Sequence, residues 1–390
     1  MISVASALNQ LFRLICLMET EHVRLDQASS RILSRQVIAK RNQPPFDSAS
    51  MDGYAVSDLR PKYNDQYKVV GEAAAGKRFS KTVARGQAVR VFTGAPIPVG
   101  TKTIIIQEDI VIKKNTIIVS KTIENKTFIR RCGCDFQKGF SVKAPRLLRS
   151  ADIALLASMN ISLVPVFRKP KIAIIATGDE LVMPGEKPKP DQIISSNNYG
   201  LASLIKENGG NPHIFPVAKD KIDSLTTTFE MAQDADLIIT IGGASVGDYD
   251  YVMKAAKHFG FKKVFYKIAM RPGKPMMAGL LGNTPMLGLP GNPVSAMVCG
   301  QIFLLPLLNS MLGLAQKARD RVIGKMGQEL QPNGGREHYM RASLIEGFLY
   351  LPNSQDSSLL TTLSESNALI VRPPNSPAAK PNELVPYIPL

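Results

Sequence analysis

Cysteine is scarce in this chain of 390 residues, which has only Cys16, Cys132, Cys134 and Cys299. Four thiols so far apart cannot build a disulfide framework, and the one close pair, C-x-C, has no histidine near it to complete a zinc site. We therefore expect reduced thiols and a cytoplasmic protein. Basic residues interleaved with aromatic ones, as in single-strand binders, are also missing, so the net charge of +16 does not predict nucleic-acid binding.

Long hydrophobic runs are missing as well, since none approaches the roughly 18 residues of a membrane span. The N-terminus lacks a basic n-region and a small-residue cleavage site, and Val4, Ala7, Leu8 and Leu11 recur there at helical spacing. This spacing predicts an amphipathic helix in place of a signal peptide. We expect a soluble globular protein with no membrane partner, long enough for several domains.

The predicted secondary structure changes twice in the first half of the chain. Residues 1–45 are predicted to be helical, with a second amphipathic helix over Ser29–Lys40, and a helical pattern returns after residue 145. Between them lie short alternating strands separated by turn residues, which are typical of a small all-β domain. The sequence therefore predicts a discontinuous helical linker domain (1–45 and 140–168) that is interrupted by a β-rich domain (46–139).

The second half alternates strands with helices, which predicts a doubly wound, mostly parallel α/β domain over 169–318. After Gly313 short strands and turns return, and they predict a C-terminal β-barrel or sandwich over 319–390. The expected strands of the α/β domain are 172–176, 213–217, 236–241, 263–268, 276–280 and 286–289, and the expected helices are 196–208, 221–233, 250–259 and one that begins at Pro293.

One stretch of the α/β domain, Leu237–Asp250 (LIITIGGASVGDYD), is a buried strand that ends abruptly in a glycine-rich polar loop. Glycines after a strand often serve only as turn residues. Here they come with a hydroxyl and carboxylates, a combination that suits an anion and metal site. The candidate ligand-binding residues of this loop are Gly242, Gly243, Ser245 and Gly247, followed by Asp248 and Asp250.

Two further strands of this domain also end in glycine-rich polar loops. IAIIATGDEL ends at Glu180, and LGLPGNPV places Pro290, Gly291, Asn292 and Pro293 where a helix begins. With Ser295 in its first turn, that helix offers an anion seat. Three such strand ends predict a ligand-binding crevice at the carboxyl edge of an open parallel sheet.

The β-rich domain carries three polar motifs of its own: FDSASMDGYAV with Asp52, FTGAPIP with Thr93, and IRRCGCD with Arg130 and Asp135. Two alternatives stay open here. The first motif has the composition of a simple hairpin turn. The arginines are either solvated surface charges or part of a phosphate-binding site.

Taken in order, these motifs resemble the molybdopterin molybdenumtransferase family, which includes the bacterial MoeA proteins and the E domain of gephyrin. The resemblance covers nearly the whole chain. It implies a homodimer of four-domain subunits with a central molybdopterin-binding α/β domain, and an active site shared between the subunits. It also implies insertion of molybdate into adenylylated molybdopterin with release of AMP, supported by Mg²⁺. The motifs are FDSASMDGYAV, FTGAPIP, IRRCGCD, ATGDEL, GGASVGDYDY, RPGKP and LPGNPVSA.

The resemblance also implies roles for individual residues. Carboxylates would act in catalysis, two of them as metal ligands; hydroxyl, arginine and glycine positions would bind the pterin substrate; and four cations with one serine would hold molybdate. The catalytic set is Glu180, Asp220, Asp250, Asp52 and Asp135, with Glu180 and Asp250 as metal ligands. Thr93 and Arg130 join the glycine-loop and LPGNP residues in substrate binding, and the molybdate or anion set is Lys267, Arg271, Lys274, Ser295 and Arg341.

Three positions depart from the family pattern. Arg271 begins RPGKP where members commonly have lysine, which exchanges a point donor for a planar fork. Cys132 and Cys134 stand where the family usually has an arginine and an acid.

Two other functions remain open: a molybdopterin adenylyltransferase-type activity, and a non-enzymatic cofactor-binding or scaffold role. A molybdopterin adenylyltransferase is also a possible partner.

Overall fold

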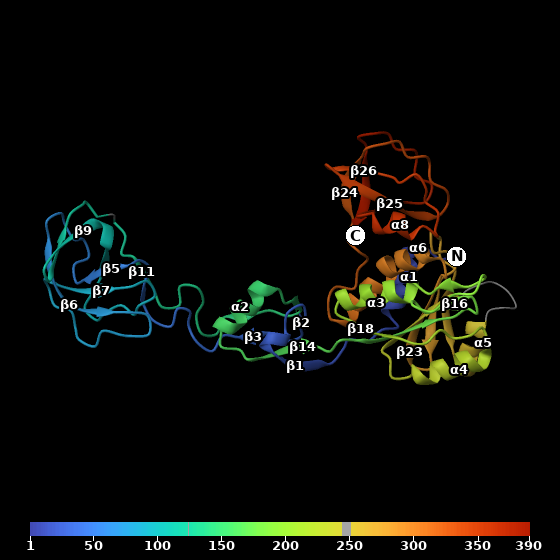
Figure 1. Cartoon of the computed structure of the whole chain (residues 1–390), viewed down its shortest axis with the longest axis horizontal. Coiled ribbons are helices and arrows are strands. Elements are labelled where there is room, and N and C mark those ends of the chain that lie inside the picture. Colours follow the sequence, from blue (N-terminus) through green and yellow to red (C-terminus); the bar gives the residue numbers. More distant parts are fainter. Residues whose placement is uncertain (124, 244–250) are drawn as a thin grey trace. The chain divides into compact units, whose positions relative to one another are not determined.

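The computed structural model describes residues 1–123, 125–243 and 251–390 (Figure 1). The chain forms two compact units, each built from segments that are separated in sequence. Unit 1 consists of Met1–Glu21, Ser30–Ser34 and Val166–Leu390, and unit 2 of His22–Ser29 and Arg35–Pro165. The four domain boundaries expected from the sequence are finer than this division and stay predictions.

The centre of unit 1 is a six-stranded sheet in the order β18-β15-β19-β23-β22-β20. Its first four strands run parallel, and β22 and β20 join antiparallel at one edge. The mostly parallel sheet predicted from the strand-helix alternation is therefore confirmed. The strands are β15 (Lys171–Ala176), β18 (Asn211–Ile214), β19 (Leu237–Ile241), β20 (Lys262–Tyr266), β22 (Met277–Leu281) and β23 (Thr284–Leu289).

Helices cover both faces of this sheet, because successive residues of the buried strands point to opposite sides. Ile172 and Ile174 pack with α1, α3 and α6, whereas Ala173 and Ile175 pack with α4 and α5. Figure 1 shows the same division, with α3 and α6 on one side of β23 and α4 and α5 on the other. The helices are α1 (Val4–Phe12), α3 (Asn197–Glu207), α4 (Ile222–Met231), α5 (Tyr251–His258) and α6 (Pro293–Cys299).

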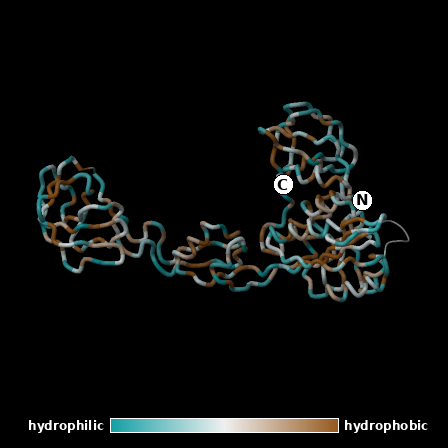
Figure 2. Tube along the Cα trace, in the orientation of Figure 1, coloured by the Kyte–Doolittle hydropathy of each residue, from teal (hydrophilic) through white to brown (hydrophobic). Residues whose placement is uncertain are grey.

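The helix that begins at Pro293 continues through a π-helical turn (Gly300–Leu304) into α7 (Leu305–Met311). Over Pro293–Met311 it has the length and hydropathy of a membrane span, which corrects the expectation that no apolar run approaches that size. Because 83% of the apolar window is buried inside the protein, it is a core helix. Figure 2 shows hydrophobic segments gathered on the sheet and on the helices that pack against it.

The C-terminal part of unit 1 is a closed five-stranded barrel, as the sequence predicted. The strands pair in the ring β25-β26-β24-β28-β27, and β27 returns to β25. Short β21 (Met270–Arg271) adds to β25 in parallel, so a loop of the α/β part is hydrogen-bonded to the barrel. The elements are β24 (Val322–Met326), β25 (Glu337–Ile345), β26 (Phe348–Tyr350), α8 (Leu360–Ser364), β27 (Ala368–Arg372) and β28 (Leu384–Pro389).

Unit 2 contains the predicted β-rich domain, a six-stranded sheet in the order β8-β5-β7-β6-β10-β9. Unit 2 also contains the two-stranded pairs β4/β11 and β3/β12 and the helix α2 (Ser150–Ser158). The large sheet comprises β5 (Gly53–Val56), β6 (Gln66–Ala73), β7 (Gln87–Val91), β8 (Thr103–Ile106), β9 (Ile110–Lys113) and β10 (Thr116–Val119). The short strands are β3 (Val37–Ile38), β4 (Ser48–Ala49), β11 (Ile129–Arg130), β12 (Ser141–Val142) and β13 (Arg146–Leu147).

The helix predicted over Ser29–Lys40 is wrong. This stretch instead forms β2 (Ile32–Leu33) and β3, and Ser30 has a left-handed φ of 61°. The strands pair with residues more than a hundred positions later, Leu33 with Val166 of β14 (Leu163–Phe167) and Val37 with Val142. Long-range pairing of β-branched and aliphatic residues has overridden a local helical spacing. β1 (Thr20–Arg24) likewise lies where the sequence predicted helix.

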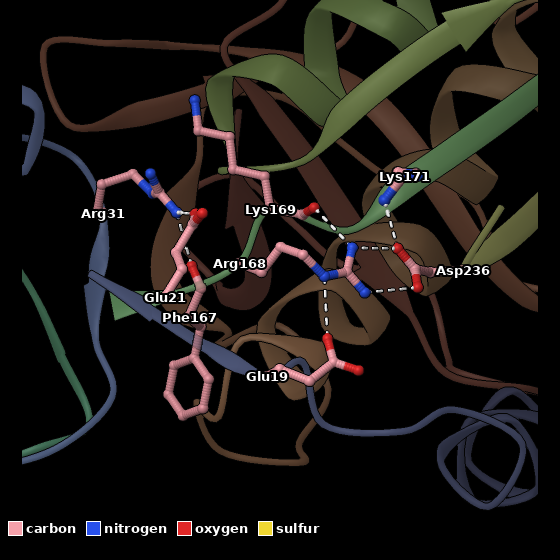
Figure 3. Close-up of polar contacts among 8 residues, drawn as sticks. All are labelled: Glu19, Glu21, Arg31, Phe167, Arg168, Lys169, Lys171 and Asp236. Atoms are coloured by element: carbon pink, nitrogen blue, oxygen red, sulfur yellow. Dashed lines mark hydrogen bonds and ion pairs between the residues drawn. The ribbon is translucent and has the colours of Figure 1, made fainter. Parts of the chain in front are cut away.

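A polar network ties the segment that enters β15 to the rest of unit 1 (Figure 3). The Arg168 guanidinium donates to both carboxylate oxygens of Asp236, at 2.8 and 2.9 Å, and through Nε to Glu19 at 2.9 Å. The Lys171 backbone N–H donates to Asp236 Oδ2 at 2.6 Å. Burial opposes ionisation of Asp236, but these donors outweigh it and lower its pKa. The network fixes where β15 begins.

Candidate functional site

A cavity of about 770 Å³ opens at the carboxyl ends of β15, β19 and β23, where the sequence predicted a crevice. Three loops that follow these strands form much of its lining, together with the segment after β20 and one residue from the barrel. The lining includes the predicted residues Glu180, Gly242, Gly243, Lys267, Lys274, Pro290, Gly291, Asn292 and Pro293. Ser245, Gly247, Asp248 and Asp250 lie outside the described residues.

The glycines after β19 allow the loops to approach one another closely. Gly242 has a φ of 88°, and a Cβ there would lie 2.8 Å from the carbonyl oxygen of Thr177. Gly243 has a φ of 63°, and its Cβ would lie 2.3 Å from Val252 Cγ2. Larger residues at either position require a strained backbone and a displaced neighbour. The glycine loop therefore packs against both the end of β15 and α5.

The acidic residues near β15 fall into two groups. Glu180 lines the cavity, and its carboxylate lies over Gly178, where a Cβ would be 2.4 Å from Glu180 Oε2. Asp220 is outside the lining and accepts a hydrogen bond from the Thr177 hydroxyl at 2.8 Å. Thr177 itself lines the cavity, although sequence reasoning did not single it out. The sequence signal that could have identified Thr177 is its position in ATGDEL, between the end of the strand and Gly178.

Two lysines face the same cavity from the segment after β20. Lys267 has a left-handed φ of 70°, and its ammonium lies 5.5 Å from the centre of the Tyr266 ring. The carbonyl of Lys274 accepts a hydrogen bond from Ile268 N–H at 3.1 Å, which closes the turn between them. Arg271, in the middle of this turn, lies on β21 outside the lining. Among the described residues, Lys267, Lys274 and Glu180 therefore line one concave site.

The segment around α6 is joined to a loop of the barrel. The Val294 N–H donates to the carbonyl of Ser357 at 3.1 Å, and the Asn292 side chain donates to the Ser357 hydroxyl at 3.2 Å. The predicted anion seat at this helix start is thus partly taken by a carbonyl of the chain itself. Ser295 is buried outside the lining, while Ser358 of the barrel loop reaches the cavity. Sequence reasoning missed Ser358, because no local pattern indicates that the barrel contacts α6.

Arg341 is placed differently from a residue that meets an anion directly. It is 1% exposed, and its guanidinium donates to the carbonyls of Leu359 and Asp356 at 2.9 and 2.8 Å. Burial lowers its pKa. These bonds hold the loop that carries Ser358 to the cavity. The predicted molybdate contacts of Arg341, Arg271 and Ser295 stay predictions.

Unit 2 assembles the three polar motifs that the sequence placed in the β-rich domain. Asp52 accepts hydrogen bonds from the N–H and the hydroxyl of Thr93 at 2.7 and 2.8 Å, which lower its pKa. Arg130 pairs with Ser48 across β11 and β4, on the segment that leads to Asp52. Asp52, Thr93 and Arg130 are therefore brought onto adjoining segments. The backbone N–H of Asp135 donates to the carbonyl of Gln43.

Asp47, which sequence reasoning did not select, holds the turn after Arg130. Its carboxylate accepts from the Arg131 guanidinium and from the Cys132 N–H, both at 2.7 Å. The bond from the Cys132 N–H has the largest effect on the pKa of Asp47 and lowers it. Arg131 lowers this pKa further, whereas burial opposes both effects. Gly133 at φ 73° and a bond from Cys134 N–H to the Arg131 carbonyl complete the turn. Cys132 and Cys134 are exposed free thiols.

Metal ligands are sparse in the part of the chain that the structure describes. No group of three or more His, Cys, Asp or Glu side chains there is arranged to hold a metal ion. Glu180 supplies a carboxylate to the cavity. Mg²⁺ is usually bound by one or two carboxylates together with substrate oxygens and water, and Glu180 fits the protein part of such a set.

Comparisons with known protein families divide the chain into three matched regions. Residues 2–160 match the MoeA N-terminal region (domains I and II), residues 173–310 match a probable molybdopterin-binding domain, and residues 324–390 match the MoeA C-terminal region (domain IV). The first match covers most of unit 2 with the N-terminal segments of unit 1, the second covers the α/β part of unit 1, and the third covers the barrel.

Individual relatives match along almost their whole length. A molybdopterin molybdenumtransferase of Nostoc sp. is 37% identical, with 95% of this chain and 90% of the relative covered. One of Haemophilus influenzae is 34% identical, with 90% and 89% covered. Among solved structures, a molybdopterin biosynthesis MoeA protein of Pyrococcus horikosii superposes with a TM-score of 0.85 at 27% identity, with 100% of this chain and 98% of that chain covered.

Proposed function

This chain belongs to the MoeA family of molybdopterin molybdenumtransferases and is a transferase of molybdenum cofactor biosynthesis, and we propose that it inserts molybdate into adenylylated molybdopterin with release of AMP. The observation that carries the proposal is the cavity at the carboxyl edge of the sheet, where Lys267, Lys274 and Glu180 meet the glycine loop. The arrangement suits a substrate with several negative charges that lies close to backbone N–H groups.

The reaction brings two anions together, since molybdate must approach the dithiolene of a substrate that also carries phosphate. Fixed cations and N–H donors reduce the repulsion between such groups, most strongly in a site that excludes water. Lys267 and Lys274 would supply the positive charge. The glycine loop, whose residues Gly242 and Gly243 line the cavity, would hold the phosphates.

Mg²⁺ is part of the proposal. Proteins commonly hold it through one or two carboxylates plus substrate phosphates, and Glu180 in the cavity fits the protein share of such a site. Asp250 would be the second carboxylate. When bound, the ion would neutralise phosphate charge and make AMP a better leaving group. Glu180 would hold the ion.

We also propose that the chain works as a cytoplasmic homodimer in which two subunits share each active site. The polar set of unit 2, with Asp52, Thr93, Arg130 and Asp135, would come from the partner subunit. In this set the Asp52 carboxylate accepts two hydrogen bonds from Thr93, which lower its pKa and favour its ionised form. A molybdopterin adenylyltransferase is the proposed supplier of substrate.

The test is release of AMP from adenylylated molybdopterin by the purified protein, with and without molybdate and Mg²⁺. We expect release that depends on molybdate and falls about a hundredfold in Lys274→Met and in Glu180→Gln, because each removes a charge that faces the substrate. Lys187→Met and Glu186→Gln are matched controls, since both residues are exposed on the loop after Val182, outside the cavity lining. No release from a folded wild-type protein with both ions present would refute the proposed reaction.

A further inference from the structure

One wall of the cavity is apolar, in contrast to the glycine loop and the lysines. It is formed by a two-residue parallel ribbon, β16 (Leu181–Val182) and β17 (Ile193–Ile194), in which Leu181 pairs with Ile193. Leu181, Ile193 and Ile194 all line the cavity. Ile193 is 59% exposed and Ile194 40% exposed, so both side chains present aliphatic surface to the cavity or to the solvent at its mouth.

Single exposed aliphatic residues are common on protein surfaces and need no explanation. Here three aliphatic residues, two of them exposed, belong to one short ribbon in the lining of a single concave site. Ligand pockets typically combine such apolar walls with a few polar groups that fix orientation. The wall is therefore a candidate contact surface for an uncharged, flat part of the ligand.

Backbone hydrogen bonds hold this wall in place beside the charged part of the site. Ile193 N–H donates to the carbonyl of Glu180 at 2.8 Å, and Ser195 N–H donates to the carbonyl of Val182 at 2.8 Å. The first bond ties the wall directly to Glu180, which also lines the cavity. A ligand group on the wall would thus be held at a fixed position relative to Glu180.

Polar residues follow the wall immediately in sequence. Ser196 and Asn197 line the same cavity, and the Asn197 side chain donates to the carbonyl of Gly291 at 2.7 Å. This bond connects the end of the ribbon to the loop after β23. The polar edge next to the aliphatic wall matches the chemistry of a nitrogen heterocycle, which has apolar faces and a hydrogen-bonding rim.

We propose that Leu181, Ile193 and Ile194 form the seat of a planar heterocycle of the substrate and determine its affinity, while the lysines and the glycine loop take its charged groups. The proposal rests on the proposed function, since adenylylated molybdopterin carries two planar nitrogen heterocycles, the adenine and the pyrimidinone part of the pterin. The shared chemistry is a flat, uncharged nitrogen heterocycle. The two sources are separated by the arms of the test.

The test uses Ile193→Ser and Ile194→Ser in the full-length protein, with AMP and a fully oxidised pterin as separate probes in titration calorimetry. We expect about tenfold weaker binding of at least one probe in each variant, since loss of a few aliphatic groups from a ligand pocket has effects of this size. Loss with AMP alone assigns the wall to adenine, and loss with the pterin alone assigns it to the pterin. Ile193→Val should bind within about twofold of wild type.

Ile323→Ser is the matched control, because Ile323 is also 59% exposed and lies on β24 of the barrel, outside the cavity lining. Affinities of both probes within about twofold of wild type in both wall variants would overturn the proposal. A changed sedimentation coefficient with unchanged affinities would also overturn it and would show that the wall is covered by a second copy. AMP release by the wild type is measured separately, so failure of the wall is distinguishable from failure of the reaction.

Discussion

Removal of the Asp236 carboxylate is expected to destabilise unit 1 more than removal of any surface charge. The side chain is 19% exposed and its partner Arg168 30% exposed, so the pair is largely shielded from water. Asp236 accepts two bonds from the guanidinium and one from the Lys171 N–H (Figure 3). In Asp236→Ala all three are lost, and Arg168 keeps Glu19 as its carboxylate partner.

The magnitude follows from the burial of the pair. Exposed ion pairs contribute about 0–1 kcal/mol, whereas breaking a fully buried pair by removing one partner costs about 3–5 kcal/mol. A pair that is about one-quarter exposed falls between these limits, so we expect a loss of about 2–3 kcal/mol in the free energy of unfolding of unit 1. Because Arg168 and Asp236 act together, a double variant with Arg168→Met should show a coupling energy of about 1.5 kcal/mol.

Urea denaturation followed by far-ultraviolet circular dichroism measures the loss, and hydrogen exchange at the Lys171 amide reports it locally. Glu19→Ala is the control: Glu19 is 76% exposed and contacts the same guanidinium, so its loss should cost less than about 0.5 kcal/mol. A cost below about 0.5 kcal/mol for Asp236→Ala, or a coupling energy near zero, would refute the view that this network fixes the start of β15.

Gly243→Ala should lower the free energy of unfolding by about 3 kcal/mol, because Gly243 has a φ of 63° and an added Cβ would lie against Val252. Gly185→Ala is the control and should cost only about 1 kcal/mol, because Gly185 has a φ of 95° but no described atom lies within 4 Å of the added Cβ. Equal losses in urea denaturation would contradict this prediction. Burial, with the nearby positive charge of Arg271 and others, lowers the pKa of His338 from 6.5 to about 4. Between these values the unfolded chain binds a proton that the folded protein does not, so stability should fall as the pH drops from 6.5 to 4, by up to about 3 kcal/mol. His338→Asn should flatten this dependence, and an unchanged slope would exclude His338 as its source.

Much of the α/β part could be predicted from sequence, because its signals are local and repeated. Buried strands such as Leu237–Ile241 read as nearly continuous apolar runs, and the loops after β15, β19 and β23 begin directly after such runs, with Thr177, Gly242 and Pro290. The carboxyl edge of a parallel sheet then brings these loops together without further information. That is why Glu180 and the glycines were predicted to share a site.

The failures have one physical cause, contacts between residues far apart in sequence. Ile32 and Leu33 read as part of a helix, but pairing with β14 makes them a strand. Ser358 reaches the cavity only because Arg341 holds its loop and Ser357 bonds to the start of α6. No pattern within either segment encodes such contacts. The same contacts explain why Arg341, chosen as an anion ligand for its charge, has its donors directed to carbonyls of the protein.

The three departures from the family pattern can be weighed with the structure at hand. The resemblance implies that Cys132 and Cys134 stand in place of one positive and one negative residue, which would leave the net charge of the turn unchanged. Asp47 anchors this turn through Arg131 and the Cys132 N–H. Arg271 keeps its charge but lies on β21, hydrogen-bonded to the barrel, outside the cavity lining. If the residues that line the cavity make the anion contacts, Lys267 and Lys274 provide the positive charge for them. Arg271→Lys should then leave the rate of AMP release within about twofold of the wild-type rate. A tenfold change would show that Arg271 reaches the substrate.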